Sequence, residues 1–423
     1  KFYRYFLLML ECFLIYPTIA QPPINPRFER ISIEKGLPGK RVNSITQDNK
    51  GFIWLGTSNG LSRYDGYSLK NYQFDPKDSS IIYFIESLWV DKKNRLWIGT
   101  EANGLKYLDL KSGVFSHFEH DPKDPKSLSG NAVWAICEDT QNNIWFGIYG
   151  GGLDKWNEEE RNFSHYQYDS NDSSSLSNNG ITCLYEDSQG RFWIGTDVGL
   201  NLFNREQESF RRFYIDQEEV VPARQNSITA IFEDKRKQLW IGTYGNIYLF
   251  NNGKFTLIAH DFYPSTTSGM IDFSSIGQDR REGLWIGTNG QGLNLLDYTS
   301  KKYHVYKNDP SDPFSLSNNT INYTALYTDR ENNLWIGTRL GVNKYHQGFQ
   351  HFKAYEHDPE SSNSLSQNHV LAVHEDQQGT LWIGTRSDGL NRLDQATGNF
   401  KHYLHQANNP SSLSSNAIHH IVE

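Results

Sequence analysis

The sequence predicts an all-β fold: a seven-bladed β-propeller of four-stranded antiparallel blades, followed by the truncated start of a second propeller. Two observations predict this fold. A tryptophan two residues before a glycine recurs eight times at intervals of 43 to 50 residues, and an aspartate always stands six residues before it. Repeats of this length are typical of propeller blades, in which one supersecondary unit is copied around a ring. The tryptophans are Trp54, Trp97, Trp145, Trp193, Trp240, Trp285, Trp335 and Trp382.

The third repeat shows how one blade is built. Residues 132–138, 144–147, 153–156 and 163–168 form four short runs, and the first two turns between them are rich in Gly, Asn and Asp. Runs of this length with a period of two residues predict antiparallel strands joined by hairpins. Each repeat is therefore expected to be one four-stranded blade.

Recurring residues within the repeat have structural explanations. We expect the aspartate to accept hydrogen bonds from turn amides, and the tryptophan to be wedged between neighbouring blades. The residue three before the tryptophan is Gly or Asn in six copies, which suits a positive φ. Lys237 and Glu282 depart from this rule, and Gly283 is expected to adopt that conformation in place of Glu282. Small residues on the first strand, such as Ser44 and Ala135, suit an innermost strand around a channel.

The two ends of the chain suggest its organisation. Residues 1–20 read as a secretory signal peptide, because Lys1 and Arg4 precede a short apolar run and a small-residue cleavage site. Residues 21–27 form a linker. The run Phe28–Ile33 resembles a fourth strand and is expected to complete the last blade and cover its open edge.

These assignments give a first propeller over residues 28–346 and the first blade of a second over residues 347–423. The pattern restarts at residues 347–355 much as it did at Phe28. A single ring of eight or more blades remains the alternative. Residues 416–423 align with 131–138, so we expect the chain to stop inside a repeat.

Composition argues against several classes of partner. The formal net charge is −8 and no basic block occurs, so we expect no nucleic acid to bind. Cys137 and Cys183 are expected to be buried small hydrophobic residues rather than a disulfide or a metal pair. No metal-ligand spacing or helical His-Glu-x-x-His motif occurs, and we expect neither a metal nor another cofactor.

Loops between the repeats share the signature Asp-Pro, Ser-Leu-Ser, Asn, as in residues 121–131, 309–319 and 358–368. Together with Trp-Ile-Gly-Thr and the Gly-Leu-Asn-Arg-Leu-Asp of residues 389–394, these loops resemble the two-component regulator propeller repeat. The longer set is similar to the exported sensor region of hybrid two-component systems of Bacteroidota.

That resemblance implies a function. In the family, two seven-bladed propellers precede an immunoglobulin-like domain, a membrane helix and a cytoplasmic histidine kinase. It implies that this chain lies in the periplasm, binds an oligosaccharide or similar ligand, and controls carbohydrate-utilisation genes. It further implies a full-length protein that is a homodimer anchored in the inner membrane through a later segment. The residues given would then not be an enzyme, because a kinase would lie C-terminal to them.

Two other functions remain open from the residues alone. A structural or protein-interaction propeller would present a flat polar face without a small ligand. A propeller lyase or hydrolase would need a metal or carboxylate cluster at one channel mouth. Four histidines recur at one position of the outer strand and therefore lie far apart around the ring, which disfavours a metal centre: His117, His165, His304 and His402.

A ligand site is expected on the face that carries the loops between second and third strands, near the channel mouth. There the repeat keeps its glycines but varies the other residues, and functions are grafted where a repeat varies. Planar amides, arginines, acids and aromatic rings suit a polar sugar. The candidates are Glu101, Trp134, Tyr149, Asp197, Tyr244, Asn289, Tyr323, Arg339 and Arg386. In a tandem sensor the ligand could instead bind mainly to the second propeller.

Overall fold

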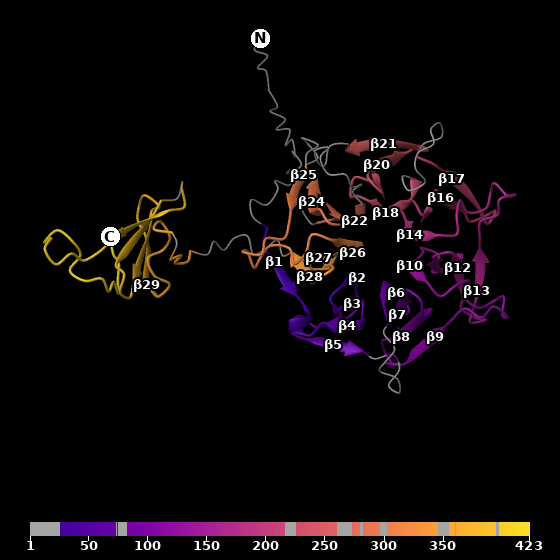
Figure 1. Cartoon of the computed structure of the whole chain (residues 1–423), viewed down its shortest axis with the longest axis horizontal. Coiled ribbons are helices and arrows are strands. Elements are labelled where there is room, and N and C mark those ends of the chain that lie inside the picture. The colour runs from indigo at the N-terminus through magenta and orange to yellow at the C-terminus, as the bar shows by residue number, and fades with distance from the viewer. Residues whose placement is uncertain are drawn as a thin grey trace, which may run out of the picture. The chain divides into compact units, whose positions relative to one another are not determined.

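A computed structural model of the chain describes residues 26–72, 74, 83–215, 226–259, 273–279, 282–296, 303–345, 355–359, 361–394 and 397–423. The predicted signal peptide lies outside these residues. Among them, no helix is both long and apolar enough to cross a membrane. The described chain is all-β, apart from the short 3-10 helix η1 (Ile33–Lys35), and forms eight four-stranded antiparallel sheets (Figure 1).

Each sheet is one blade with an inner, a second, a third and an outer strand. The inner strands are β2 (Val42–Gln47), β6 (Ile85–Val90), β10 (Val133–Glu138), β14 (Ile181–Glu186), β18 (Ile228–Glu233), β22 (Phe273–Gln278), β26 (Ile321–Thr328) and β29 (Val370–Glu375). The second strands are β3 (Ile53–Thr57), β7 (Arg95–Thr100), β11 (Ile144–Ile148), β15 (Phe192–Thr196), β19 (Leu239–Thr243), β23 (Leu284–Thr288), β27 (Leu334–Thr338) and β30 (Leu381–Thr385). The third strands are β4 (Gly60–Tyr64), β8 (Leu105–Asp109), β12 (Gly152–Asn157), β16 (Gly199–Asn204), β20 (Ile247–Asn251), β24 (Gly292–Leu296), β28 (Gly341–Tyr345) and β31 (Leu390–Leu393). The outer strands are β5 (Leu69–Tyr72), β9 (Phe115–Phe118), β13 (Asn162–Tyr166), β17 (Ser209–Phe213), β21 (Lys254–Ala259), β25 (Tyr303–Tyr306), β1 (Phe28–Ile31) and β32 (Phe400–Tyr403).

The ring closes after seven blades. Strand β1 pairs antiparallel with β28, with Phe28 opposite Tyr345, so the first strand of the chain is the outer strand of blade 7. The inner strands of blades 7 and 1 also meet, because the Asn322 side-chain amide donates to the Val42 carbonyl oxygen (2.7 Å). The expected closing strand is confirmed, and the alternative of a ring of eight or more blades is wrong.

The repeated tryptophans and glycines are explained by packing between blades. The seven tryptophans of the ring are at most 2% exposed, and each contributes to a core between adjacent blades, as expected. The glycine two residues later has no room for a side chain. A Cβ on Gly147 would lie 2.5 Å from Cγ2 of Ile181 in the next inner strand. Opposite it on β10 stands the small Ala135, which leaves space for the same isoleucine.

Each repeated aspartate binds its own tryptophan. In the third blade Asp139 Oδ2 accepts a hydrogen bond from Trp145 Nε1 (2.9 Å), while Oδ1 accepts the turn amides of Gln141 and Asn143. The same indole bond, between 2.7 and 2.9 Å, occurs in all eight repeats. The turn contacts were predicted, but the indole contact was not. The constant spacing of six residues was its only signal in the sequence.

One prediction for these turns is wrong. Lys237 and Glu282 themselves adopt positive φ (64° each), so Gly283 does not take over the left-handed position of its turn. The turn geometry is fixed by the aspartate, whose Oδ1 accepts the amide of Gly283 (2.9 Å). Those hydrogen bonds hold a side-chain-bearing residue in a conformation that glycine would adopt at lower cost.

Blades are also joined by a repeated clasp. In five blades of the ring, the side chain before the aspartate accepts the first turn amide of the preceding blade. For example, Glu186 Oε2 accepts from Thr140 N (2.7 Å), and Gln47 Oε1 accepts from Arg330 N (3.0 Å). The second pair joins blade 7 to blade 1. The same contact therefore stabilises both ordinary seams and the closing seam of the ring.

Residues 349–423 form a second compact unit, separate from the first. It contains the eighth blade, in which Asp376 binds Trp382 (2.8 Å). Beside this blade, Glu423 Oε2 accepts from Gln377 N (2.9 Å), which reproduces the clasp between blades. Residues 347–354 of the expected opening strand lie outside the described residues.

Candidate functional site

The inner strands of the seven blades surround a central channel (Figure 1). It encloses a cavity of about 440 Å³. Its middle is apolar and is lined by one aliphatic residue from each blade: Ile45, Leu88, Ile136, Leu184, Ile231, Ile276 and Leu326. None of the described residues that line this cavity is charged, although several carry hydroxyl groups, such as Thr46 and Thr229.

Apart from Arg386, the candidate residues stand on one face of the ring, which we call the mouth face. It carries the turns between second and third strands. In five blades of the ring, the first residue of that turn donates its amide to a carbonyl just before the inner strand, as in Tyr149 N to Ala132 O (2.8 Å) and Asp197 N to Gly180 O (3.0 Å). Glu101 and Arg339 are held in the same way, by the carbonyls of Phe84 and Thr320.

Three candidates are brought together on the arc formed by blades 3 and 4. The rings of Trp134 and Tyr149 are stacked, with centroids 3.8 Å apart and planes 15° apart. The Tyr149 hydroxyl is hydrogen-bonded to the Asp197 carboxylate, which also accepts from Ser227 Oγ (3.3 Å). Tyr149 remains 42% exposed, so the stack presents an aromatic edge to solvent beside a carboxylate. Stacked rings next to a hydrogen-bonding acid can bind a polar ring.

Local sequence explains this arrangement. The other blades have a threonine at the end of the second strand. Its hydroxyl group donates a hydrogen bond across the following turn, for example from Thr196 Oγ1 to Gly199 O (3.0 Å). Blade 3 has Ile148 there, followed by Tyr149 and three glycines. Gly180 is required for close approach, because a Cβ on it would lie 2.4 Å from Asp197 Oδ2.

Burial shifts the titration of this cluster. It raises the pKa of Asp197, an effect that the hydrogen bonds from Tyr149 and Ser227 oppose. Burial and the neighbouring Asp197 both raise the pKa of the Tyr149 phenol. The phenol therefore stays protonated and donates, while the carboxylate accepts.

A second group lies on blades 1 and 2. Glu101 is electrostatically coupled to Glu86 at the start of β6, and both lie near Arg41. The Arg41 guanidinium stands 5.1 Å from the Phe84 ring centroid. Burial raises the pKa of Glu86 to about 7, Arg41 lowers it and Glu101 raises it. Glu86 and Arg41 were not among the sequence candidates.

The remaining candidates are dispersed. Tyr244 is close enough to Tyr149 to influence its ionisation. Asn289, on blade 6, forms an isolated β-bridge with Thr320. Tyr323 lies in an irregular part of β26, where Thr324 has a positive φ of 55°. Arg386 belongs to the second compact unit. The six residues Arg41, Glu86, Glu101, Trp134, Tyr149 and Asp197 are called the mouth arc below.

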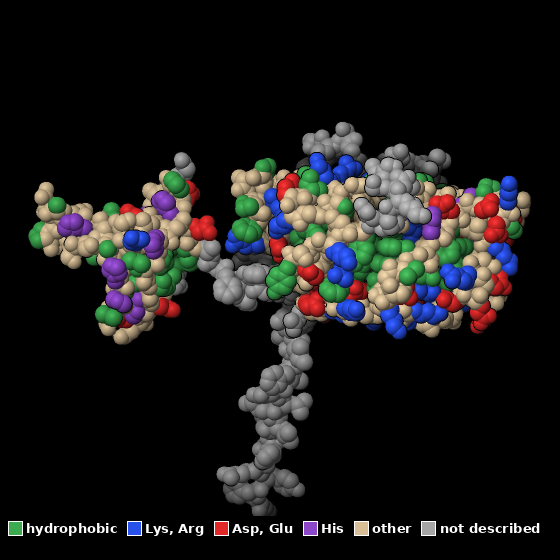
Figure 2. All heavy atoms as spheres, turned by 90° about the horizontal axis from the view of Figure 1, so that it is seen from below, with side chains coloured by type: hydrophobic (Ala, Val, Ile, Leu, Met, Phe, Trp, Pro, Cys, Tyr) green, Lys and Arg blue, Asp and Glu red, His purple; other side chains and the backbone are tan. Residues whose placement is uncertain are grey.

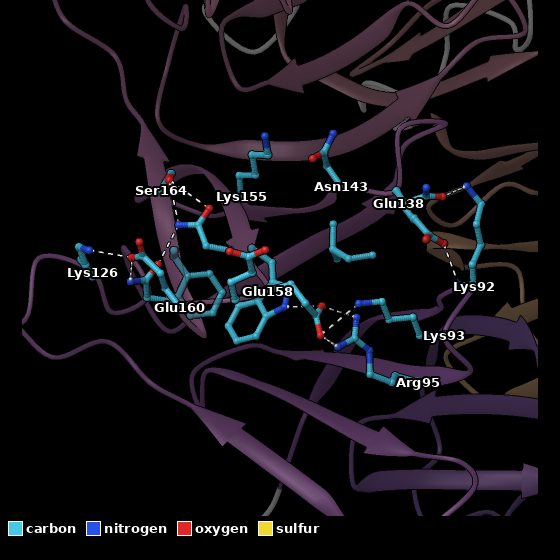
Figure 3. Close-up of a pocket in the computed structure, with 17 residues that line it drawn as sticks. Lys92, Lys93, Arg95, Lys126, Glu138, Asn143, Lys155, Glu158, Glu160 and Ser164 are labelled. Atoms are coloured by element: carbon cyan, nitrogen blue, oxygen red, sulfur yellow. Dashed lines mark hydrogen bonds and ion pairs between the residues drawn. The ribbon is translucent and has the colours of Figure 1, made fainter.

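A second hollow, larger than the channel cavity, is a less suitable ligand site. A groove of about 950 Å³ between blades 2 and 3 is lined by both acids and bases (Figure 3). Its charges pair with one another: Glu158 binds Arg95 Nη1 (2.9 Å) and Lys93 (3.3 Å), and Lys126 binds Glu160 (2.8 Å). Because these ions already have partners, the groove offers few unmet groups to a ligand.

Metal and thiol chemistry find no support in the described ranges. Within them, no group of three or more His, Cys, Asp or Glu side chains is arranged to hold a metal ion. Cys137 and Cys183 are free and buried, and burial raises the pKa of each thiol to about 12. They are packing residues, as expected. Basic and acidic side chains are interspersed on the visible wall of the ring (Figure 2).

Comparison with known proteins identifies the repeat. The model of the two-component regulator propeller matches residues 36–59, 127–150, 175–198, 223–245, 315–339 and 364–387. A curated relative, histidine kinase P4 of Formosa agariphila, is 36% identical over 77 residues, which are 18% of this chain and 6% of the kinase.

Solved structures show the same architecture. The extracellular domain of BT3049 from B. thetaiotaomicron, named as a hybrid two-component system, is 28% identical with a TM-score of 0.67 over 94% of this chain and 50% of that chain. That of BT4673 from the same organism is 21% identical, with a TM-score of 0.62 over 89% of this chain and 54% of that one. A streptogramin B lyase, 15% identical with a TM-score of 0.58 over 77% of this chain and 99% of that one, shares the fold alone. The chain spans about half the length of the two extracellular domains.

Proposed function

We propose that the chain is the periplasmic sensor region of a transmembrane hybrid histidine kinase and regulator, because the two-component regulator propeller model matches six of its segments. Its ligand is an oligosaccharide or a similar glycan fragment, and its output is the control of carbohydrate-utilisation genes. The similarity to extracellular domains of hybrid two-component systems supports the sensing role and the location outside the cytoplasm. The full-length sensor acts as a homodimer that is anchored in the inner membrane by a segment beyond these residues.

One observation supports ligand binding at the mouth arc. In a ring of near-identical blades, the stack of Trp134 and Tyr149 occurs where blade 3 departs from the repeat. Its rings supply an apolar face for a sugar, and Asp197 supplies an acceptor for hydroxyl groups. The channel below is apolar, so a sugar would bind across the mouth rather than pass through it.

The test is a thermal-shift screen of the purified protein against neutral, acidic and amino oligosaccharides. We expect at least one of them to raise the melting temperature. Tyr149→Ala should weaken the binding of that ligand roughly three- to tenfold, because it removes one stacked ring. Tyr67→Ala is the matched control, since Tyr67 is 98% exposed and outside the mouth arc. Equal loss in both variants, or no stabilisation by any sugar, would favour a structural or protein-interaction propeller.

A further inference from the structure

Glu86 occupies a position that other blades use as a latch. There the second residue of the inner strand donates a side-chain hydrogen bond to the first carbonyl of the next inner strand. Asn43 donates to Ile85 O (2.9 Å), and Thr182 donates to Ile228 O (2.5 Å). In blade 2 the next residue, Ser87, makes the bond instead, to Val133 O (3.0 Å). Within the described ranges, the side chain of Glu86 therefore makes no hydrogen bond between blades 2 and 3.

The side chain of Glu86 is partly buried and has no counter-ion in contact among the described residues. Across the described part of the chain, Glu86 makes no hydrogen bond through its side chain and no ion pair within 4.0 Å. The charged groups that influence it are Arg41, from the loop before β2, and Glu101, from the turn after β7. An enclosed carboxylate without a partner is costly, and such groups tend to persist where they meet a ligand.

Trp134 fills the equivalent position in the adjacent blade. It likewise makes no latch, and its Nε1 has no hydrogen-bond partner among the residues that the structure describes. Since Ser87 bonds the carbonyl of Val133, Glu86 and Trp134 flank the same seam. Glu86 and Trp134 therefore stand at equivalent positions on adjacent inner strands, and Trp134 is one ring of the aromatic platform formed with Tyr149.

The charge of the mouth arc selects the ligand class. It contains three acids, Glu86, Glu101 and Asp197, against one base, Arg41, and Arg41 already lies over the Phe84 ring. A uronic acid would meet the three carboxyl groups, whereas a protonated amine would supply the counter-ion that Glu86 lacks.

We propose that the mouth arc binds an amino sugar, with the sugar ring on the platform of Trp134 and Tyr149 and its ammonium group paired with the carboxylate of Glu86. This inference rests on the proposed sugar-sensing function and adds the ligand class and a contact residue. The sugar ring and its ammonium group bind together, the ring on the aromatic platform and the ammonium at Glu86. A small amine without a sugar ring therefore binds much more weakly.

Isothermal titration at pH 7 tests the inference. The probes are a glucosamine oligosaccharide, its N-acetylated form, a neutral glucose oligosaccharide, a galacturonate oligosaccharide and ethanolamine. We expect the glucosamine oligosaccharide to bind most tightly. Glu86→Gln should weaken it roughly tenfold to hundredfold, the range of a charged hydrogen bond, and should leave the N-acetylated and neutral sugars within about twofold.

Glu206→Gln is the matched control, because it removes the same charge from an exposed turn outside the mouth arc. If a neutral or acidic sugar binds as tightly as the amino sugar, or if Glu86→Gln weakens all sugars equally, the inference is overturned while the sensing function stands. If no sugar binds, both fail. Circular dichroism of the variants shows whether the fold is retained.

Discussion

At the scale of single residues, Glu86 makes stability depend on pH. Burial raises its pKa to about 7 in the folded protein from 4.5, so the folded state holds the proton more tightly than the unfolded state. This contribution to stability is fully present below about pH 4.5 and is lost as pH rises to about 7. The loss corresponds to on the order of 1–3 kcal/mol.

Glu86→Gln should remove that loss. The variant is expected to melt higher than the wild type at pH 8 and close to it at pH 4.5, because glutamine does not titrate. Differential scanning fluorimetry at both pH values measures the two differences. A variant whose melting temperature differs from the wild type by the same amount at both values would contradict an enclosed, unpaired carboxyl group.

Lys237 carries a second residue-scale prediction. It adopts a φ of 64°, which costs a side-chain-bearing residue about 1 kcal/mol relative to glycine. Lys237→Gly should therefore raise the free energy of unfolding by about that amount, since its ion pair with Glu233 is long (3.9 Å) and exposed on the lysine side. Chemical denaturation measures the change. Arg236→Gly, in the same turn but outside the positive-φ positions, should lower stability instead.

At the scale of elements, β1 closes the ring. Phe28 is 2% exposed and packs on Tyr345, with ring centroids 5.8 Å apart. Phe28→Ala should lower the free energy of unfolding by roughly 3–5 kcal/mol, as for other buried aromatic residues. Ile33→Ala, in the adjacent η1, removes a side chain that is 39% exposed and should cost much less. Similar urea midpoints for the two variants would mean that β1 does not hold the ring closed.

Most of the blade could be predicted from the sequence, because conserved spacings between the repeated residues mark its strands and turns. The interval between Asp139 and Trp145 is the same in every copy, and strands of period two follow from it. The contact between their side chains could not be predicted from one copy, because it depends on how the turn folds back on the second strand. The position of β1 was predictable because an extra strand must cover an open edge.

The candidate site was only partly predictable. Trp134, Tyr149 and Asp197 were found as departures from the repeat, and the structure brings them together. Glu86 was not among the candidates from the sequence, because its lack of a partner among the described residues depends on Ser87 making the hydrogen bond to the Val133 carbonyl oxygen. Arg386 follows the same repeat position but belongs to another compact unit, which the spacing alone does not reveal.

At the scale of the whole molecule, seven similar blades form a closed ring, and the proposed ligand site lies where the similarity fails. The Asp–Trp bonds occur in every blade of the ring and the clasps at five of its seams, so both are general features of the repeat. Only the mouth arc combines stacked rings with an unpaired carboxyl group among the residues described here. We therefore propose that a ligand is recognised on blades 1 to 4 of the mouth face.

The most direct test of this claim is a crystal structure of the protein in complex with the best ligand from the oligosaccharide screen. We predict electron density for a sugar ring against Trp134 and Tyr149, with polar contacts to Asp197 and Glu86. Density in the groove between blades 2 and 3, or only on residues 349–423, would contradict the account and leave the mouth arc as a structural feature of the ring.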